Sequence, residues 1–390
     1  MNSDFHYYAT YCAAAIAGFP HEACQEICYS AQLVDHCTKT FLKTINGPLS
    51  AATTQLQSEM VNARTDLLGL QDITRIWSSF HFLPRDLYAE VKRGSKKYKD
   101  KYRLICGPNG SLVVDTVNLA KDHGNEAIGL AMHVLADTWA HTYFAGTPSL
   151  VINNTDSHFF ELVPQEDGSF VRRPIEFGHN PAAKEDPKKG AYTGSLYQAS
   201  ENNIMNLGHG RAGHLPDYSF IRYVYLPAWG NYEEIVKDNP HDYIHAFAQM
   251  VYALQYLNGT YPEFEKETYA WEAIEPYREE IERILSVRRV DDSQDWKALG
   301  ESITGETIRD FKIDEYQKEY TSTPKDKKDE ETFLGRFFIA AMTHKSMVTS
   351  RISASGSRLA GISIDYISRG FHGINDYRKI IKKTEDRDNL

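Results

Sequence analysis

The sequence has no apolar run that approaches the roughly 20 residues needed to cross a bilayer. Its start, MNSDFHYYATYCAAAIAGF, holds an apolar stretch but lacks the basic residues that open a secretory signal. Cationic residues are also few, since 43 Lys and Arg stand against 53 Asp and Glu, giving a formal net charge of -10. This balance disfavours an extended face for nucleic acid, although bound metal ions can reverse the charge of a local site. We expect no transmembrane segment and a cytoplasmic location.

The sequence contains only five cysteines, which is an odd number. Of the five cysteines, four lie within the first 40 residues beside small apolar neighbours. These neighbours favour buried free thiols in packed helices over a disulfide framework. The odd count in turn favours a reducing compartment.

Most of the sequence shows the periodicity of α-helices. Apolar residues recur at helical spacing, and caps and breakers predict helices over 4–17, 20–43, 123–144, 241–257, 262–287 and 332–351. Segment 147–240 is rich in Gly, Pro, Asn and Tyr, and its runs SLVIN and IRYVYL are only short and β-like, so we predict long ordered loops with a small hairpin at most. We expect an all-α fold. Residues 1–258 would form a metal-binding helical domain that includes this loop-rich insertion, and residues 259–390 a helical C-terminal region packed on it.

The main candidate site lies on the helix predicted over 123–144, where His133, Asp137 and His141 form an HxxxDxxxH pattern. Residues four apart advance by about 40° around an α-helix, so the three side chains lie along one stripe. Imidazole and carboxylate are natural zinc ligands. The alternative is that each is a polar core residue with a hydrogen bond of its own. Three ligand-type residues in register favour a metal site.

A second cluster lies in the Gly-rich segment GHGRAGHLPD, which contains His209, His214 and Asp217. Glycine lets the backbone approach a site closely, so this loop can bring further ligands to the helix pattern. We expect His214 and Asp217 to be such ligands. His209 is an additional candidate that also suits a loop histidine packed on a neighbour.

Further candidates lie nearer the start of the chain. Asp35 follows an apolar helical run, where a lone carboxylate would cost several kcal/mol unless it is paired or bound to a metal. His81 lies between two phenylalanines, and the start of the chain contributes Asp4 and His6. Taken singly, each is more often structural than a ligand.

The order of these residues resembles the zinc-dependent phospholipase C and single-strand nuclease superfamily. The segment HFLP after Phe80, the AGH at 212–214 and the start DFHYYA carry the likeness, and that start also resembles a bacterial family of unknown function. The resemblance spans residues 4–217. It implies a helical phospholipase C/nuclease-like bundle that binds one to three zinc ions through, in chain order, His6, Asp35, His81, His133, Asp137, His141, His214 and Asp217.

The resemblance also implies how these ligands divide between ions. One ion would take Asp35, His81, His133 and Asp137, and a second His141, His214 and Asp217. A third would take His6, with Asp137 as a bridge and Asp4 in place of the free amine that secreted members use. Such a cluster hydrolyses a phosphodiester or phosphomonoester with a metal-activated water, with Asp35 and Asp137 in catalytic roles. The substrate would be a small phosphoester, a lipid head group or a single-stranded nucleic acid.

Two alternatives stay open. The pair His241-Asp242 superficially suits a metal-dependent phosphohydrolase or amidohydrolase with another ligand set, although Asp at a helix start is a common capping residue. The chain could also be a metal-stabilised binding or structural protein without catalysis, whose ligands saturate the metals.

Overall fold

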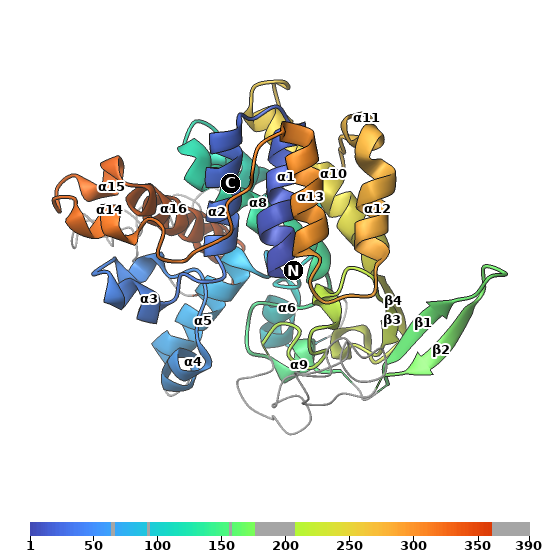
Figure 1. Ribbon diagram of the computed structural model, residues 1–390. Coiled ribbons are helices and arrows are strands. Elements are labelled where there is room, and N and C mark those ends of the chain that lie inside the picture. Colours follow the sequence, from blue (N-terminus) through green and yellow to red (C-terminus); the bar gives the residue numbers. More distant parts are fainter. Residues whose placement is uncertain (64–66, 92–93, 156–157, 176–206, 361–390) are drawn as a thin grey trace.

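Helix α8 (Gly124–Ala140) lies at the centre of the computed structural model, which describes residues 1–63, 67–91, 94–155, 158–175 and 207–360 (Figure 1). Every residue from Glu126 to Ala140 is buried. A helix that is covered on all sides is typical of a protein core. Its neighbours include α2 (His21–Leu33), α7 (Ser111–Ala120), α10 (Asn239–Leu257) and α16 (Phe333–Ala354).

The packing of α8 against α2 depends on a glycine. A Cβ atom at Gly129 would lie only 2.1 Å from the carbonyl oxygen of Ile27, so no larger residue fits this contact without a shift of the backbone. One turn further along both helices, Nδ1 of His133 lies 2.9 Å from the carbonyl oxygen of Ala31. The close approach of the two helices therefore orients one of the predicted ligands.

The remaining helical elements surround this pair. They are η1 (Asp4–Ala9), α1 (Thr10–Ile16), α3 (Lys39–Thr44), η2 (Leu49–Ala51), α4 (Gln57–Ala63), α5 (Leu67–Phe80), α6 (Lys96–Tyr102), α9 (Leu150–Asn153), η4 (Leu215–Asp217), η5 (Ala228–Gly230), α11 (Trp271–Ile274), η6 (Glu275–Tyr277), α12 (Arg278–Ser286), α13 (Ser293–Thr304), α14 (Gln317–Ser322) and α15 (Lys328–Glu331). The helix predicted over 20–43 is broken into α2 and α3, because Thr38 starts a new helix by accepting a hydrogen bond from the backbone N–H of Phe41.

The prediction of an all-α fold is wrong, because four strands form an antiparallel sheet within segment 147–240. The strands are β1 (Phe160–Pro164), β2 (Phe170–Pro174), β3 (Arg222–Tyr225) and β4 (Ile235–Asp238), in the order β2-β1-β3-β4. The β1–β2 hairpin projects from the body of the molecule (Figure 1). The fold is therefore mixed α and β: it is mostly helical and contains one small antiparallel sheet. Residues 176–206 of the predicted loop-rich insertion lie outside the described residues.

Short strands explain why the sheet escaped prediction. Each strand has only four or five residues, too few for a clear alternation of apolar and polar side chains. The pairing of Phe160 with Val224 joins parts of the chain that no local sequence window connects. Of the two β-like runs, IRYVYL contains β3, whereas most of SLVIN forms the short helix α9.

The buried apolar residues of the described ranges form two hydrophobic clusters. The larger combines α8 with helices from both ends of the chain, and it includes Tyr11, Leu135, Trp296 and Phe337. The C-terminal helices α12, α13 and α16 therefore share the core of the first 258 residues. The smaller cluster joins the sheet to nearby loops, as where the ring of Phe144 stacks on Tyr225 with centroids 5.7 Å apart.

Two expectations from composition bear on the described residues. All five cysteines are buried and none forms a disulfide, which confirms the prediction of buried free thiols. Within the described ranges, no helix combines the length and apolar character needed to cross a membrane.

Candidate metal centre

Helix α8 presents the predicted stripe of ligands to the interior. His133 and Asp137 lie in its last two turns, and His141 caps its C-terminus. The three residues are between 0% and 4% exposed. Because their side chains share one face of a rigid helix, their spacing is set by the helix alone.

Asp137 is the hub of the cluster. Its Oδ2 atom lies 3.2 Å from Nδ1 of His81 and 3.2 Å from Nε2 of His133. Its Oδ1 atom lies 3.2 Å from Nε2 of His6 and 2.8 Å from the α-amino nitrogen of Met1. Residues from η1, the end of α5 and α8 thus converge on one buried carboxylate.

The ligand atoms form three groups in the described part of the chain, two of which share His133, and within each group all of them lie within 4.8 Å of one another. Each group supplies three protein ligands, the number that catalytic zinc sites use while a further position stays open. The groups are His6, His133 and Asp137; Asp35, His81 and His133; and His141, His209 and Asp217.

Backbone carbonyls hold four of the imidazoles. A carbonyl oxygen only accepts hydrogen bonds, so the ring nitrogen next to it must carry the proton, and in a neutral ring the other nitrogen presents a lone pair. The pairs are His133 Nδ1 with Ala31 O at 2.9 Å, His81 Nε2 with Thr53 O at 3.1 Å, His141 Nδ1 with His81 O at 2.7 Å, and His209 Nδ1 with Gly213 O at 2.7 Å. Their second nitrogens face the carboxylates of the three groups.

The electrostatics of the cluster suit a cation. Burial lowers the pKa of His81, and it lowers the pKa of His6 and of His209 to about 4, so these rings are neutral near pH 7. Burial raises the pKa of Asp137, but its interactions with neighbouring groups, first His141 and then the Met1 amine, bring it well below its usual range. Lone pairs of neutral imidazoles therefore point at an ionised carboxylate, and a cation between them would relieve the repulsion.

The environment of His6 also favours a bound cation. It is fully buried, and neither of its ring nitrogens makes a hydrogen bond with any residue that the structure describes. Its ring stacks on that of His133 with centroids 3.8 Å apart, which directs Nε2 at Asp137. Buried polar groups without a partner are rare and costly. A metal ion bound beside Asp137 fits this orphaned nitrogen.

The number of ions is limited by His133. Its Nδ1 is used by the carbonyl of Ala31, so only Nε2 can serve as a ligand, yet His133 belongs to two of the three groups. One nitrogen lone pair binds one ion. The ligands therefore support one ion at Nε2 of His133, with His6, Asp35, His81 and Asp137 around it, and a second near His141, His209 and Asp217.

The structure redistributes two of the predicted ligands. His209 replaces His214 in the group around Asp217, while the His214 side chain is 56% exposed and lies with Nδ1 3.2 Å from Asp217 Oδ2. Asp4 is turned away from all three groups, because its carboxylate accepts hydrogen bonds from the backbone N–H groups of Phe5 and Asp292.

The α-amino nitrogen of Met1 occupies the place expected for Asp4. It lies 2.8 Å from Asp137 Oδ1 and 3.4 Å from Asp217 Oδ1, and the two carboxylates hold its pKa at about 11 in spite of its burial. A positive charge thus lies between two of the predicted ligands. The sequence gives no signal for this contact, since an α-amino group belongs to the backbone and not to any type of side chain.

The cluster opens toward solvent on two sides. The side chain of Asp35 is 31% exposed, and Nε2 of Gln32 donates to it at 3.4 Å. On the other side, His214 and, less, His209 reach the surface. The remaining ligands lie deep, so water and a substrate can approach near Asp35 or near the 208–217 loop.

The pair His241-Asp242 lies outside the three groups. Asp242 accepts from the buried Nζ of Lys237, which also donates to the carbonyl oxygen of Trp139 at 2.8 Å. The His241 side chain is 56% exposed. The Asp242 carboxylate thus has a cationic partner within the protein.

Comparison with known proteins identifies the family of the chain. A family profile described as a family of unknown function, DUF6765, matches residues 1–352. The chain belongs to this family. No curated protein and no solved structure matches it. The DUF6765 match covers the N-terminal residues, α8, the 208–217 loop and most of α16, so it includes every residue of the three groups.

Proposed function

We propose that this DUF6765 protein is a metal-dependent phosphoesterase that uses zinc. The observation that carries the proposal is the convergence of imidazole lone pairs on Asp137 and Asp217 in a buried cluster that still reaches solvent. Nitrogen and carboxylate ligands in groups of three fit zinc better than magnesium or calcium, which prefer oxygen ligands. The order of the ligands along the chain, which resembles zinc-dependent phospholipases C and single-strand nucleases, supports phosphoesters as the substrate class.

Bound zinc would supply Lewis acidity to a phosphoester and to the attacking water. The protein residues would do the rest. Asp137 would stay ionised and hold the groups around His6, His81 and His133 in one arrangement. Asp35 would border the reacting phosphoester, because it is the ligand carboxylate with the most exposure.

The surroundings of the cluster also fit this chemistry. The ring of Phe82 stacks on His141 with centroids 4.8 Å apart, and Trp77 packs beside His81. Apolar rings beside the ligands exclude water and strengthen the electrostatic interactions within the site. We place the protein in the cytoplasm, where its buried free thiols would stay reduced.

The test is elemental analysis followed by a panel of substrates. The metal-loaded protein would be assayed with p-nitrophenyl phosphate, bis(p-nitrophenyl) phosphate, a short-chain phosphatidylcholine and a single-stranded oligonucleotide. We expect hydrolysis of at least one of them, its loss with a chelator and its return with zinc. Asp137→Asn should abolish it, whereas Asp242→Asn should retain both metal and activity.

Other outcomes would favour the alternatives. The deep burial of His133 and His6 also suits metal ions that only hold the fold together. Bound metal with no hydrolysis of any of these substrates would support that non-catalytic function. Loss of metal in Asp242→Asn but not in Asp137→Asn would instead support a site at His241 and Asp242.

A further inference from the structure

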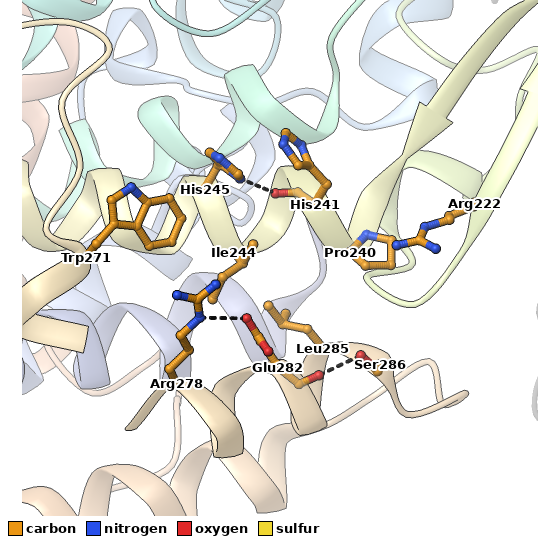
Figure 2. Close-up of a pocket in the computed structure, with 10 residues that line it drawn as sticks. All are labelled: Arg222, Pro240, His241, Ile244, His245, Trp271, Arg278, Glu282, Leu285 and Ser286. Atoms are coloured by element: carbon orange, nitrogen blue, oxygen red, sulfur yellow. Dashed lines mark hydrogen bonds and ion pairs between the residues drawn. The ribbon is translucent and has the colours of Figure 1, made fainter. Parts of the chain in front are cut away.

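A second cavity lies away from the metal ligands, between the first turns of α10 and helix α12. It has a volume of about 590 Å³, and none of the predicted ligands lines it. Figure 2 shows His241, Ile244 and His245 along one side, Arg278 and Glu282 on the facing helix, Trp271 at one end and Arg222 at the other. Three separate parts of the chain thus build one concave surface.

A guanidinium lies toward each end of the cavity, and each is paired with a carboxylate. Nε of Arg278 donates to Glu282 at 2.9 Å, and Nε of Arg222 donates to Asp238 at 2.8 Å. Nη1 of Arg278 also lies 3.5 Å from Oε2 of Glu275. Each guanidinium has five N–H donors, so these contacts still leave donors for a ligand. Both side chains are also partly exposed, at 46% and 34%. Forked donors of this kind match the oxygens of phosphate and carboxylate.

In the histidine pair on α10, His241 adds to this preference for anions. The rings of His241 and His245 lie 3.9 Å apart, on consecutive turns at the helix N-terminus. The carboxylate of Asp242 raises the pKa of His241 through a hydrogen bond, which favours the cationic ring. Nδ1 of His245 donates to the carbonyl oxygen of His241 at 2.8 Å, and burial lowers the pKa of this ring, so its Nε2 presents a lone pair and would bind a donor of the ligand rather than the anionic group. Both rings lie where the helix dipole also favours an anion.

The rest of the lining is aromatic and apolar. Trp271 contacts His245 edge to face at 4.9 Å, and the guanidinium carbon of Arg278 lies 5.7 Å from the Trp271 ring centroid. Ile244 and Leu285 supply apolar surface between the two charged ends. A cavity with this lining suits a ligand with a ring as well as a charge.

We propose that this cavity binds a small organic oxyanion, a phosphate or carboxylate carried on an aromatic ring. The guanidinium of Arg278 binds the anionic group, and Trp271, Ile244 and Leu285 contact the ring. The site is independent of the proposed hydrolysis, since its lining shares no residue with the metal groups.

The test measures binding by calorimetry to the metal-loaded protein. Phenylphosphonate, whose carbon–phosphorus bond a phosphoesterase does not cleave, and benzoate serve as ring-bearing oxyanions. Methylphosphonate lacks the ring, and benzyl alcohol lacks the charge. We expect one of the first two to bind at least tenfold more tightly than either of the last two. The tighter of the two identifies the anionic group.

Variants then place the ligand. Arg278→Gln should weaken binding at least tenfold. The matched control Arg283→Gln, on the same helix and with similar exposure but paired with Glu280 outside the cavity, should leave it unchanged. Asp137→Asn should also leave binding unchanged, although it removes the proposed hydrolysis. The proposal fails if neither ring-bearing anion binds, if both arginine variants behave alike, or if Asp137→Asn alone abolishes binding.

Discussion

Nδ1 of His81 lies 3.2 Å from Oδ2 of Asp137, while Nε2 of the same ring lies 3.1 Å from the carbonyl oxygen of Thr53. The carbonyl fixes the proton on Nε2, so the neutral ring turns its lone pair toward a carboxylate. Two electron-rich atoms then face each other in a buried place. This relationship is stable when a cation lies between them, and it leads to the first two predictions.

Asp137→Asn should remove bound metal. The amide keeps the size of the side chain but loses the negative charge that connects His6, His81 and His133. Changes outside the ligand shell alone cost about 10–100-fold in metal affinity, so we expect a loss of more than about 100-fold for the hub itself. Elemental analysis after dialysis against a fixed free zinc concentration measures the change.

The matched control for this variant is Asp115→Asn. Asp115 lies on the neighbouring helix α7, pairs with Arg351 and belongs to none of the three groups. It should retain the metal content of the parent protein. Equal metal content in the Asp137 and Asp115 variants would show that Asp137 is not a ligand.

Removal of the metal should destabilise the fold. Without the metal ion, the Met1 amine still lies between Asp137 and Asp217, but the lone pairs of His81 and His133 face the carboxylates of Asp35 and Asp137 in a largely buried place. A buried ion without its partner costs several kcal/mol. A ligand at 100 times its Kd stabilises the folded state by about 2.7 kcal/mol. We therefore expect a chelator to lower the Tm by several degrees, measured by differential scanning fluorimetry, and added zinc to restore it. A Tm that ignores the chelator in a protein shown to contain metal would contradict this role.

His344 should make stability depend on pH independently of the metal. It is buried on α16, its Nε2 lies 2.9 Å from the hydroxyl of Thr116, and burial lowers its pKa to about 3. The unfolded chain, with a pKa of about 6.5, binds a proton before the folded protein does. The contribution of neutral His344 to the free energy of unfolding is therefore complete above pH 6.5, and it is lost as the pH falls from 6.5 toward 3.

The contribution of His344 is measurable with a variant. Between pH 7.5 and pH 5, protonation of the unfolded state should remove about 2 kcal/mol from the free energy of unfolding. His344→Leu cannot titrate, so its stability should fall less over this interval, whatever its absolute value. Urea unfolding at several pH values gives the difference. Parallel pH profiles for the parent and the variant would show that His344 does not titrate in this way.

The stripe on α8 could be predicted because one helix sets its geometry. His133, Asp137 and His141 need only helical spacing to share a face, and that spacing is visible in the sequence. The direction of Asp4 could not be predicted. Its carboxylate is held by the backbone N–H of Asp292, which folding brings from the far end of the chain. A contact of this range has no local signal.

The loop at 208–217 shows an intermediate case. Its histidines were visible, but which of them faces the metal groups depends on the path of the backbone. Gly208 and Gly213 have φ values of 54° and 56°, and a Cβ at Gly208 would lie 2.1 Å from the ring of Phe82. These two left-handed turns bring His209 inward and leave His214 exposed. Residue types alone predict the turns but not which side chain they direct inward.

Gly129→Ala should disturb both the fold and the metal centre. The added methyl group would lie 2.1 Å from the carbonyl oxygen of Ile27 and 3.0 Å from the backbone nitrogen of Ala31, so α2 must move away from α8. Overpacking of this kind costs about 1–3 kcal/mol. The same shift withdraws the carbonyl of Ala31 from His133, so metal affinity should fall together with the Tm.

Gly230→Ala is the matched control, because its Cβ would meet only the Pro227 ring at an ordinary 3.4 Å. It should change neither the Tm nor the metal content. Measuring both quantities for the two variants separates packing from coordination. If Gly129→Ala lowers the Tm but binds zinc as tightly as the parent, the α2–α8 contact stabilises the fold without positioning His133. If both quantities fall together, the packing of these two helices positions the ligand.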